Sequence, residues 1–86
     1  MLYLLGDKGT GAQGLKYAHM DADAVIVLIK DGVFLDVTSL EGKKIYAMEE
    51  DVKKRAMEDR LEGRAVMIGY DVLVDLILEN KVANFA

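Results

Sequence analysis

The amino-acid sequence predicts a small α/β domain, in which a mostly parallel sheet of four to five strands has helices on both faces. Two observations lead to this fold class. Short aliphatic runs alternate with segments of helical character, which is the pattern of strand–helix–strand units. The run at residues 24–29 is apolar without a break and rich in β-branched residues, as expected of a central parallel strand. With 86 residues and no visible linker or repeat, the chain is expected to form one domain over residues 1–86.

Five short apolar blocks, separated by charged residues, are predicted as strands: residues 2–5, 24–29, 45–48, 65–68 and 82–85. Between the second and third blocks, Asp31-Gly32 allows two interpretations. Asp-Gly between two apolar runs is a strong hairpin signal, which would make these strands antiparallel. The alternative is a strand-to-helix turn that leads into a short helix over residues 33–37. The residue pattern alone leaves both interpretations open.

Two helices are predicted in the second half of the chain. Acidic residues open the segment 49–61, where they suit the positive end of a helix dipole, and Gly63 provides a break after it. The next helix covers residues 71–79. Asp71 can cap its start, and Asn80 suits its C-terminal end.

A glycine-rich segment, residues 6–14, is predicted to be a loop that opens into a helix over about residues 12–20. Gly9, Gly11 and Gly14 have the spacing of dinucleotide-binding loops, where backbone N–H groups and a helix N-terminus bind a pyrophosphate. The motif begins several residues after the first strand, however, and the chain is too short for a full dinucleotide domain. These glycines therefore either bind a nucleotide or other anion or simply allow a tight backbone path.

Three carboxylates, Asp7, Asp31 and Asp71, fall near the predicted carboxyl ends of strands, where α/β sheets place their sites. Such residues can hold Mg²⁺, but Asp is also a common turn and cap residue. We predict the second role, and we expect neither a metal nor a cofactor.

Composition excludes several classes of chemistry. The chain has no cysteine, which excludes disulfides, thiolate nucleophiles, zinc–thiolate sites and persulfide carriage by this chain. One histidine, His19, cannot form a multi-histidine metal site, and no nucleophile–base motif surrounds the only serine, Ser39. We therefore predict that the chain is not an enzyme. The formal net charge of −4 disfavours direct nucleic-acid binding, which depends on Lys and Arg.

No apolar run approaches the roughly 20 residues that a membrane-spanning helix needs. The opening run, residues 1–5, is too short for a secretion signal. The sequence therefore predicts a cytoplasmic protein that does not contact a membrane.

The helix predicted at residues 71–79 has an unusually wide apolar surface. At 100° per residue its acidic residues share one stripe, and apolar residues cover the remaining arc of roughly 240°. A helix on one face of a sheet needs only about 100° of apolar surface. The C-terminal tail or a neighbouring helix could cover the excess. We expect instead a protein interface, formed by Leu73, Val74, Ile77, Leu78 and Phe85.

The segment 28–33, LIKDGV, is the first of three blocks that stand in order and at matching distances. It resembles the strand-to-helix signature of the TusB/DsrH family, and the other two blocks resemble the same family. The second is the strand at 45–48 with the acidic and basic residues that follow it, and the third begins at residue 68. The residues that carry the resemblance most clearly are Asp31, Gly32, Tyr46, Asp51, Arg55 and Tyr70.

Membership would imply the DsrE/DsrF/DsrH-like fold, a parallel sheet between helices, and would make Asp31-Gly32 a strand-to-helix turn. It also implies a non-catalytic subunit of an oligomeric sulfur-relay complex, beside TusC/TusD-like (DsrE/DsrF-like) subunits. In that system persulfide sulfur passes toward 2-thiouridine at the tRNA wobble position, or toward sulfur oxidation, and the TusD-type subunit carries the reactive cysteine of the tRNA pathway. Two other hypotheses are a nucleotide- or anion-binding module that uses Gly9, Gly11 and Gly14, and a stand-alone homo-oligomer of the same fold.

The chain departs from the family pattern in three places. The glycine-rich segment 6–14 is not a family hallmark, and Ala56 stands where the family usually has a glycine after the arginine. DsrH-type members can carry a cysteine, which this chain lacks. The missing cysteine favours TusB-like behaviour, in which any sulfur is carried by a partner's thiol.

Overall fold

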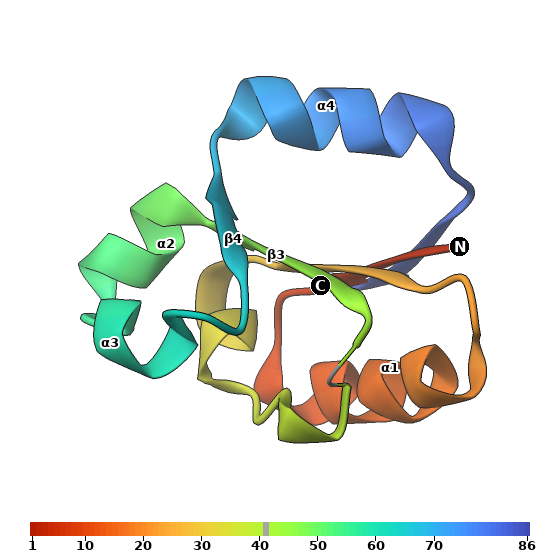
Figure 1. Ribbon diagram of the computed structural model, residues 1–86, viewed down its shortest axis with the longest axis horizontal. Helices are drawn as coiled ribbons and strands as arrows, with labels where there is room; N and C mark the ends of the chain where they lie inside the picture. The colour runs from red at the N-terminus through yellow and green to blue at the C-terminus, as the bar shows by residue number, and fades with distance from the viewer. Residues whose placement is uncertain (41) are drawn as a thin grey trace.

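The computed structural model describes residues 1–40 and 42–86 and contains a five-stranded parallel sheet with helices on both faces (Figure 1). The predicted fold class and all five predicted strands are confirmed, with ends that shift by a residue at three of them. The strands, in the spatial order β4-β3-β2-β1-β5, are β1 (Leu2–Leu5), β2 (Val25–Leu28), β3 (Lys44–Met48), β4 (Val66–Ile68) and β5 (Val82–Phe85).

The path of the chain explains which helices cover which face. From β1 to β4 the chain moves steadily toward one edge of the sheet, and β5 then returns to the opposite edge beside β1. Because parallel crossovers are right-handed, a reversal of direction places the connecting helix on the other face. In Figure 1, accordingly, α4 (Tyr70–Glu79) lies alone on one side of the sheet and α1 (Lys8–Met20) on the other.

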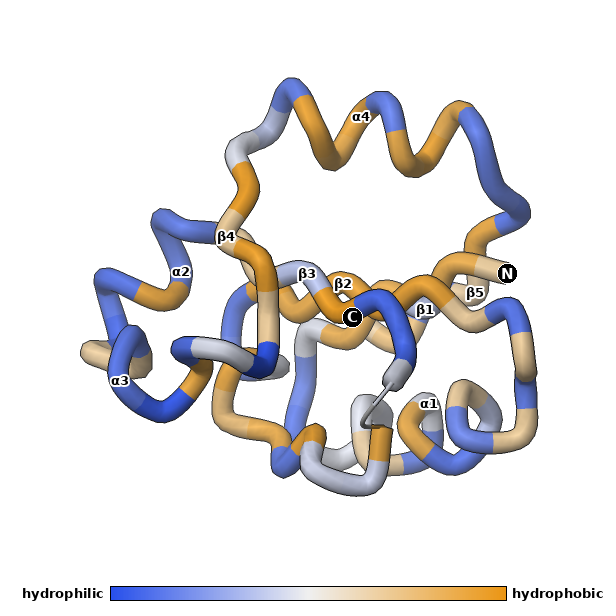
Figure 2. The backbone as a smooth tube through the Cα atoms, viewed as in Figure 1, coloured by the Kyte–Doolittle hydropathy of each residue, from blue (hydrophilic) through white to orange (hydrophobic). Residues whose placement is uncertain are grey.

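Alternation along the strands divides the apolar side chains between two clusters. On β2, Ile26 and Leu28 belong to the cluster beneath α1, whereas Val27 belongs to the cluster beneath α4. Among the described residues, the α1-side cluster has fourteen buried members and the α4-side cluster has four, with half-buried Leu73 and Leu76 from α4 packed against them. Hydrophobic residues therefore fill the space between sheet and α1 more completely, although they also run along α4 (Figure 2).

The turn after β2 is a strand-to-helix turn, so the hairpin interpretation is wrong. Strands β2 and β3 pair in parallel, with Ile26 beside Ile45. A 3₁₀ helix, η1 (Lys30–Phe34), follows β2, and a second one, η2 (Thr38–Leu40), precedes β3. The short helix predicted over 33–37 thus begins earlier and is of the 3₁₀ type.

The single helix predicted over residues 49–61 is wrong, because the structure divides it. The first part is α2 (Glu49–Lys54) and the second is α3 (Glu58–Leu61). Between them Ala56 has a φ of 53°, in the left-handed region, which a continuous right-handed helix does not allow. The break lets both Val52 and Leu61 reach the α1-side cluster.

The start of α4 also differs from the prediction. Gly69 is the N-terminal capping residue, and Asp71 lies inside the first turn, so Asp71 is not the cap. The predicted C-terminal end is confirmed: Asn80 is the capping residue, and its side-chain amide donates a hydrogen bond of 2.9 Å to the carbonyl of Leu76.

Candidate functional site

A cluster of charged side chains lies where the carboxyl ends of β2 and β3 meet. Arg55 donates from Nε to Asp31 Oδ1 at 3.0 Å, and its Nη1 lies 3.4 Å from Asp51 Oδ1. Asp51 Oδ2 accepts a 2.8 Å hydrogen bond from the backbone N–H of Lys30, whose φ of 49° is in the left-handed region. The cluster therefore holds a strained turn after β2 against α2. Three of the residues that carry the family resemblance thus come together in a structural role.

Gly32 belongs to the same turn, and its role is steric. A Cβ atom at this position would overlap the backbone oxygen of Leu5. That oxygen already accepts a 2.9 Å hydrogen bond from the N–H of Ile29, so it cannot move aside. Glycine lets η1 pass directly over the end of β1. The two remaining residues of the resemblance, Tyr46 and Tyr70, lie outside the cluster, on β3 and at the start of α4.

The predicted glycine-rich loop is wrong, because Gly9, Gly11 and Gly14 lie inside α1. Asp7 caps this helix: its Oδ2 accepts hydrogen bonds from the N–H groups of Thr10 and Gly9 at 3.1 and 3.0 Å. These two bonds, Thr10 first, lower the pKa of the Asp7 carboxyl. A carboxylate thus already occupies the helix end that the alternative hypothesis of an anion site would use, and a bound phosphate would have to compete with it.

The three carboxylates near strand ends have separate surroundings. Asp7 caps α1, Asp31 pairs with Arg55, and Asp71 lies exposed on α4. Within residues 1–40 and 42–86, no group of three or more His, Asp or Glu side chains could hold a metal ion.

The exposed surface of α4 is the most distinctive feature of the molecule. None of its ten residues, all of them described, is buried. Leu73 faces the sheet and is half-buried, whereas Val74, Ile77 and Leu78 are exposed, Leu78 to 79%. The neighbouring apolar side chains Tyr70 and Val72 are exposed as well. Four of the five predicted interface residues therefore share this helix, and three of them are accessible.

Phe85, the fifth predicted interface residue, lies on the other face of the sheet. Its ring stacks on Tyr3 and Tyr17, with centroids 6.4 and 6.0 Å apart, and it is half-buried. The C-terminal strand therefore does not cover α4, but neither does Phe85 extend the α4 surface. The register of an edge strand decides which face of the sheet each side chain joins, and the sequence did not reveal this register. The prediction that Phe85 belongs to the α4 surface is therefore wrong.

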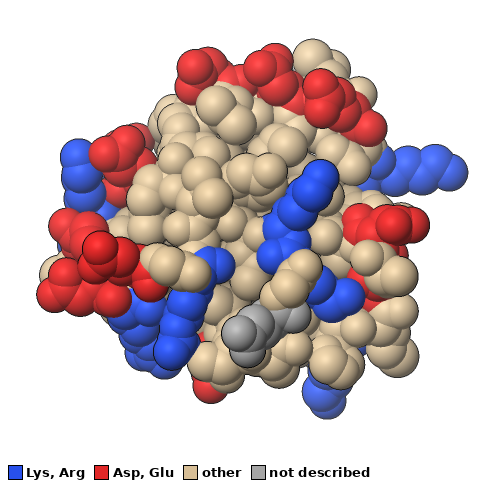
Figure 3. Space-filling model, viewed as in Figure 1, with Lys and Arg blue, Asp and Glu red and all other residues tan. Residues whose placement is uncertain are grey.

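Acidic side chains run along α4. Asp71, Asp75 and Glu79 are all exposed, and Figure 3 shows acidic groups along the top of the molecule, where α4 lies. No Lys or Arg occurs between residues 70 and 79. None of the three carboxylates forms an ion pair with any residue that the structure describes.

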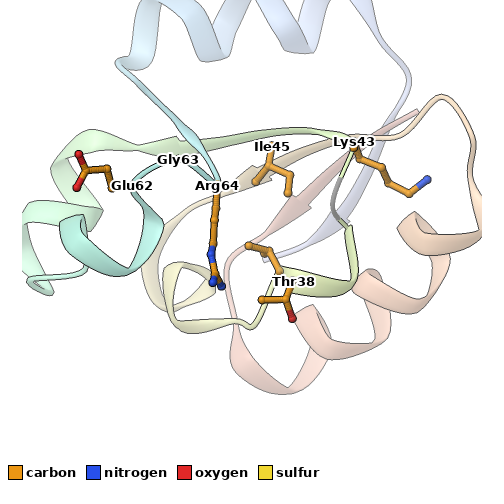
Figure 4. A pocket seen from close by; sticks show the side chains of 8 residues that line it. Thr38, Lys43, Ile45, Glu62, Gly63 and Arg64 are labelled. Carbon is orange, nitrogen blue, oxygen red and sulfur yellow. The ribbon is translucent and has the colours of Figure 1, made fainter.

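A hollow of about 440 Å³ opens between the amino end of β3 and the turn that precedes β4 (Figure 4). Thr38, Lys43, Glu62 and Arg64 are among its lining residues, and Lys43 Nζ donates to the carbonyl of Asp21 at 2.8 Å. Sequence reasoning singled out none of these residues. The hollow lies at the amino ends of the strands, away from the carboxyl edge at which open α/β sheets bind ligands, and we assign it no ligand.

Comparison with known families supplies the decisive observation. The sequence profile of the family described as "DsrH like protein" matches residues 15–83, which is most of the chain. The chain belongs to the DsrH family. The match begins after Gly14, so the glycine-rich start of α1 lies outside the matched residues. The resemblance predicted from the three sequence blocks is confirmed.

Among curated proteins, the chain is similar to proteins named TusB from three subspecies of Buchnera aphidicola. The chain is 29% identical to Protein TusB of the subspecies Schizaphis graminum and 30% identical to that of the subspecies Acyrthosiphon pisum, in each case over 59 residues. Both alignments cover 69% of this chain and 62% of the relative. The chain thus spans somewhat less than two thirds of the length of these relatives. No solved structure matches it significantly.

As for membranes, no helix in the described part of this DsrH-family chain is both long enough and apolar enough to span a bilayer.

Proposed function

We propose that this chain is a non-catalytic, TusB-like subunit of a sulfur-relay complex. Membership of the DsrH family and the relatives named TusB support a place in sulfur relay. The absence of cysteine in the sequence supports a role without covalent chemistry, because sulfur carriage requires a thiolate. The observation that carries the proposal is the uncovered apolar surface of α4, since exposed apolar surface of this kind marks protein interfaces.

In this proposal the partners are DsrE/DsrF-like (TusC/TusD-like) subunits in the cytoplasm, and a partner's cysteine holds the persulfide. The proposed end product is the 2-thiolated wobble uridine of tRNA. The chain itself contacts neither RNA nor membrane, in keeping with its net charge of −4. Its contribution is to hold the cysteine-bearing subunit in a competent assembly.

The test is co-expression with cysteine-containing DsrE/DsrF-like proteins from the same organism, followed by measurement of the mass of the purified complex. Wild-type chain should co-purify in a fixed ratio, and Leu78→Asp should abolish the complex. Met20→Asp is the matched control, because Met20 is exposed to 73%, against 79% for Leu78, but lies on α1. Met20→Asp should leave the complex intact.

Two results would contradict the proposal. One is failure of the wild-type chain to bind any such relative; the other is sulfane sulfur bound to the isolated chain. A homo-oligomer that ignores these relatives would favour the stand-alone alternative, for which the same exposed helix would be the contact. Solution mass without partners separates the two hypotheses.

A further inference from the structure

The charges on α4 are arranged without internal compensation. Asp71, Asp75 and Glu79 are four residues apart, a spacing at which like charges on a helix repel one another. Glu79 also lies in the last turn, where the negative end of the helix dipole disfavours an acidic group and where α4 has no basic residue. On α2, by contrast, Glu49 and Lys53 form an ion pair of 2.9 Å. A helix that stays exposed to solvent would be stabilised by ion pairs of the same kind.

Beside the acidic stripe lies an apolar one. Tyr70, Val74 and Leu78 are exposed to 63%, 52% and 79%. Each of these residues directly precedes one of the three acidic residues of α4. At 100° per residue, the apolar stripe and the acidic stripe therefore run next to each other along the helix. The accessible surface of α4 therefore combines an apolar ridge with one negatively charged border.

We propose that α4 binds a partner subunit whose surface offers an apolar groove bordered by Lys or Arg side chains. This inference rests on the proposed function and names the chemistry of the partner at the same surface. The apolar ridge supplies contact area, and the acidic border selects the partner and speeds the encounter through electrostatic attraction. The carboxylates that repel one another in the free chain are compensated in the complex.

The same charges argue against a second copy of this chain as the occupant. A two-fold interface places the same surface on both subunits. Two copies of α4 would bring six carboxylates and no basic residue of either helix to one interface, and like charges in an interface weaken it. Phosphate groups of nucleic acid or of an anionic membrane would be repelled by the same border.

The experiment compares two triple variants of equal charge change. The test variant is Asp71→Asn, Asp75→Asn and Glu79→Gln on α4. The control is Glu58→Gln, Asp59→Asn and Glu62→Gln, which are exposed acidic residues at α3. Binding of each to the co-purified DsrE/DsrF-like subunits is measured by association kinetics at about 50 mM and about 500 mM NaCl, since salt screens exposed charges.

At low salt the α4 variant should bind at least about fivefold more weakly, mainly through slower association, and its affinity should depend less on salt. The control should stay within about twofold of the wild type. Equal effects of the two variants, or none, would overturn the inference. The α4 variant should melt close to the temperature of the wild type, because the repulsion that it loses is offset by the loss of the favourable position of Asp71 at the positive end of the helix dipole.

Failure of the charge inference can be told apart from failure of the proposed function. If wild-type chain binds the subunits and the α4 variant binds equally well, only the charged border is refuted. If wild-type chain binds them at neither salt concentration, the proposed function itself fails. Without partners, sedimentation at low salt should show a wild-type monomer; a dimer that Leu78→Asp dissociates would overturn the inference.

Discussion

The two faces of the sheet are built from the same strands and yet are covered very differently. Beneath α1, side chains from α1, η1, η2, α2 and α3 meet the sheet and leave fourteen buried residues among those described. On the other face α4 alone spans the sheet, and the described residues include four buried ones. Five strands at about 4.8 Å spacing form a surface about 20 Å wide, and one helix about 10 Å across covers only part of it.

Topology, rather than hydrophobicity, produces this difference. The strands alternate apolar residues toward both faces, so both faces would favour burial. The helices that connect β1 to β4 lie on one side of the sheet, whereas, in the described part of the chain, α4 in the single reversed connection lies on the other. The thinly covered face is therefore where a second protein can add apolar contact, and the predictions below test whether the two faces differ as described.

The largest difference is expected between two leucine truncations. Leu28 is fully buried on the α1 side, so Leu28→Ala should lower the free energy of unfolding by about 2–5 kcal/mol. Leu78 is mostly exposed on α4, so Leu78→Ala should change it by less than about 0.5 kcal/mol. Urea denaturation of the isolated chain measures both. A large loss for Leu78→Ala would mean that α4 is covered even without a partner.

A pair of glycines within α1 tests how tightly that face is packed. In Gly14→Ala the new methyl group would overlap buried Leu5 and approach the Phe85 ring to 2.9 Å, so we expect a loss of about 1–2 kcal/mol despite better helix propensity. In Gly9→Ala the methyl group meets the end of the exposed Asp7 side chain at 3.3 Å, and we expect that carboxylate to shift slightly, which leaves a gain of less than about 1 kcal/mol. Thermal melts of both variants would show opposite shifts; equal shifts would contradict close packing at Gly14.

A substitution at Ala56 tests whether the left-handed turn between α2 and α3, on the α1 side of the sheet, is strained. Its φ of 53° costs an alanine roughly 1–2 kcal/mol, a cost that a glycine avoids. Part of this gain in stability is lost, because a glycine also makes the unfolded chain more flexible. Ala56→Gly should therefore stabilise the chain by about 0.5–1 kcal/mol in denaturant titration. Ala22→Gly, in an exposed turn without positive φ, is the control and should give no gain. Loss of stability in Ala56→Gly would show that the left-handed turn is not strained.

The smallest expected effect is a loss of helix stability at acidic pH, which should affect α1 and not α4. Hydrogen bonds from the N–H groups of Thr10 and Gly9 lower the pKa of Asp7 in the folded chain below its ordinary value of 3.8. The carboxylate therefore stabilises α1 fully above that ordinary value, and this contribution is lost as the pH falls through the lower, folded pKa. Amide exchange across α1 should increase over that window in the wild type and less in Asp7→Asn. No side chain caps α4, so its exchange should not follow Asp7.

Much of the fold could be predicted from the sequence because unbroken aliphatic runs mark central parallel strands. The helices were harder. Three glycines in the first helix indicate a loop by propensity, but Asp7 caps the helix two residues before Gly9, and Gly14 is needed for contact with Leu5. The break at Ala56 leaves no signal in helix propensity, because alanine is a strong helix former, although its φ is positive. The glycine that the family usually has at this position was the one indication of a left-handed turn.

The candidate surface was predicted in part. The spacing of apolar residues over 71–79 correctly indicated a helix with more apolar surface than one sheet face can bury. Sequence alone could not show that the tail pairs beside β1 and turns Phe85 toward Tyr3. It also gave no sign that Arg55 reaches Asp31, because those two residues are 24 positions apart in the chain. The contact of Arg55 with Asp51, by contrast, has the i,i+4 spacing of an ion pair within one helix.

The pairing of β5 with β1 has a consequence for biosynthesis. Leu2 lies beside Val82, and the Thr10 hydroxyl donates a 3.1 Å hydrogen bond to the carbonyl of Phe85. As the chain leaves the ribosome, β1 to β4 can associate while that side of β1 still lacks its neighbour, and closing so long a loop is slow. A nascent chain therefore presents an open strand edge, which other molecules can extend. Slow translation through α4 would prolong this exposure and favour aggregation over release.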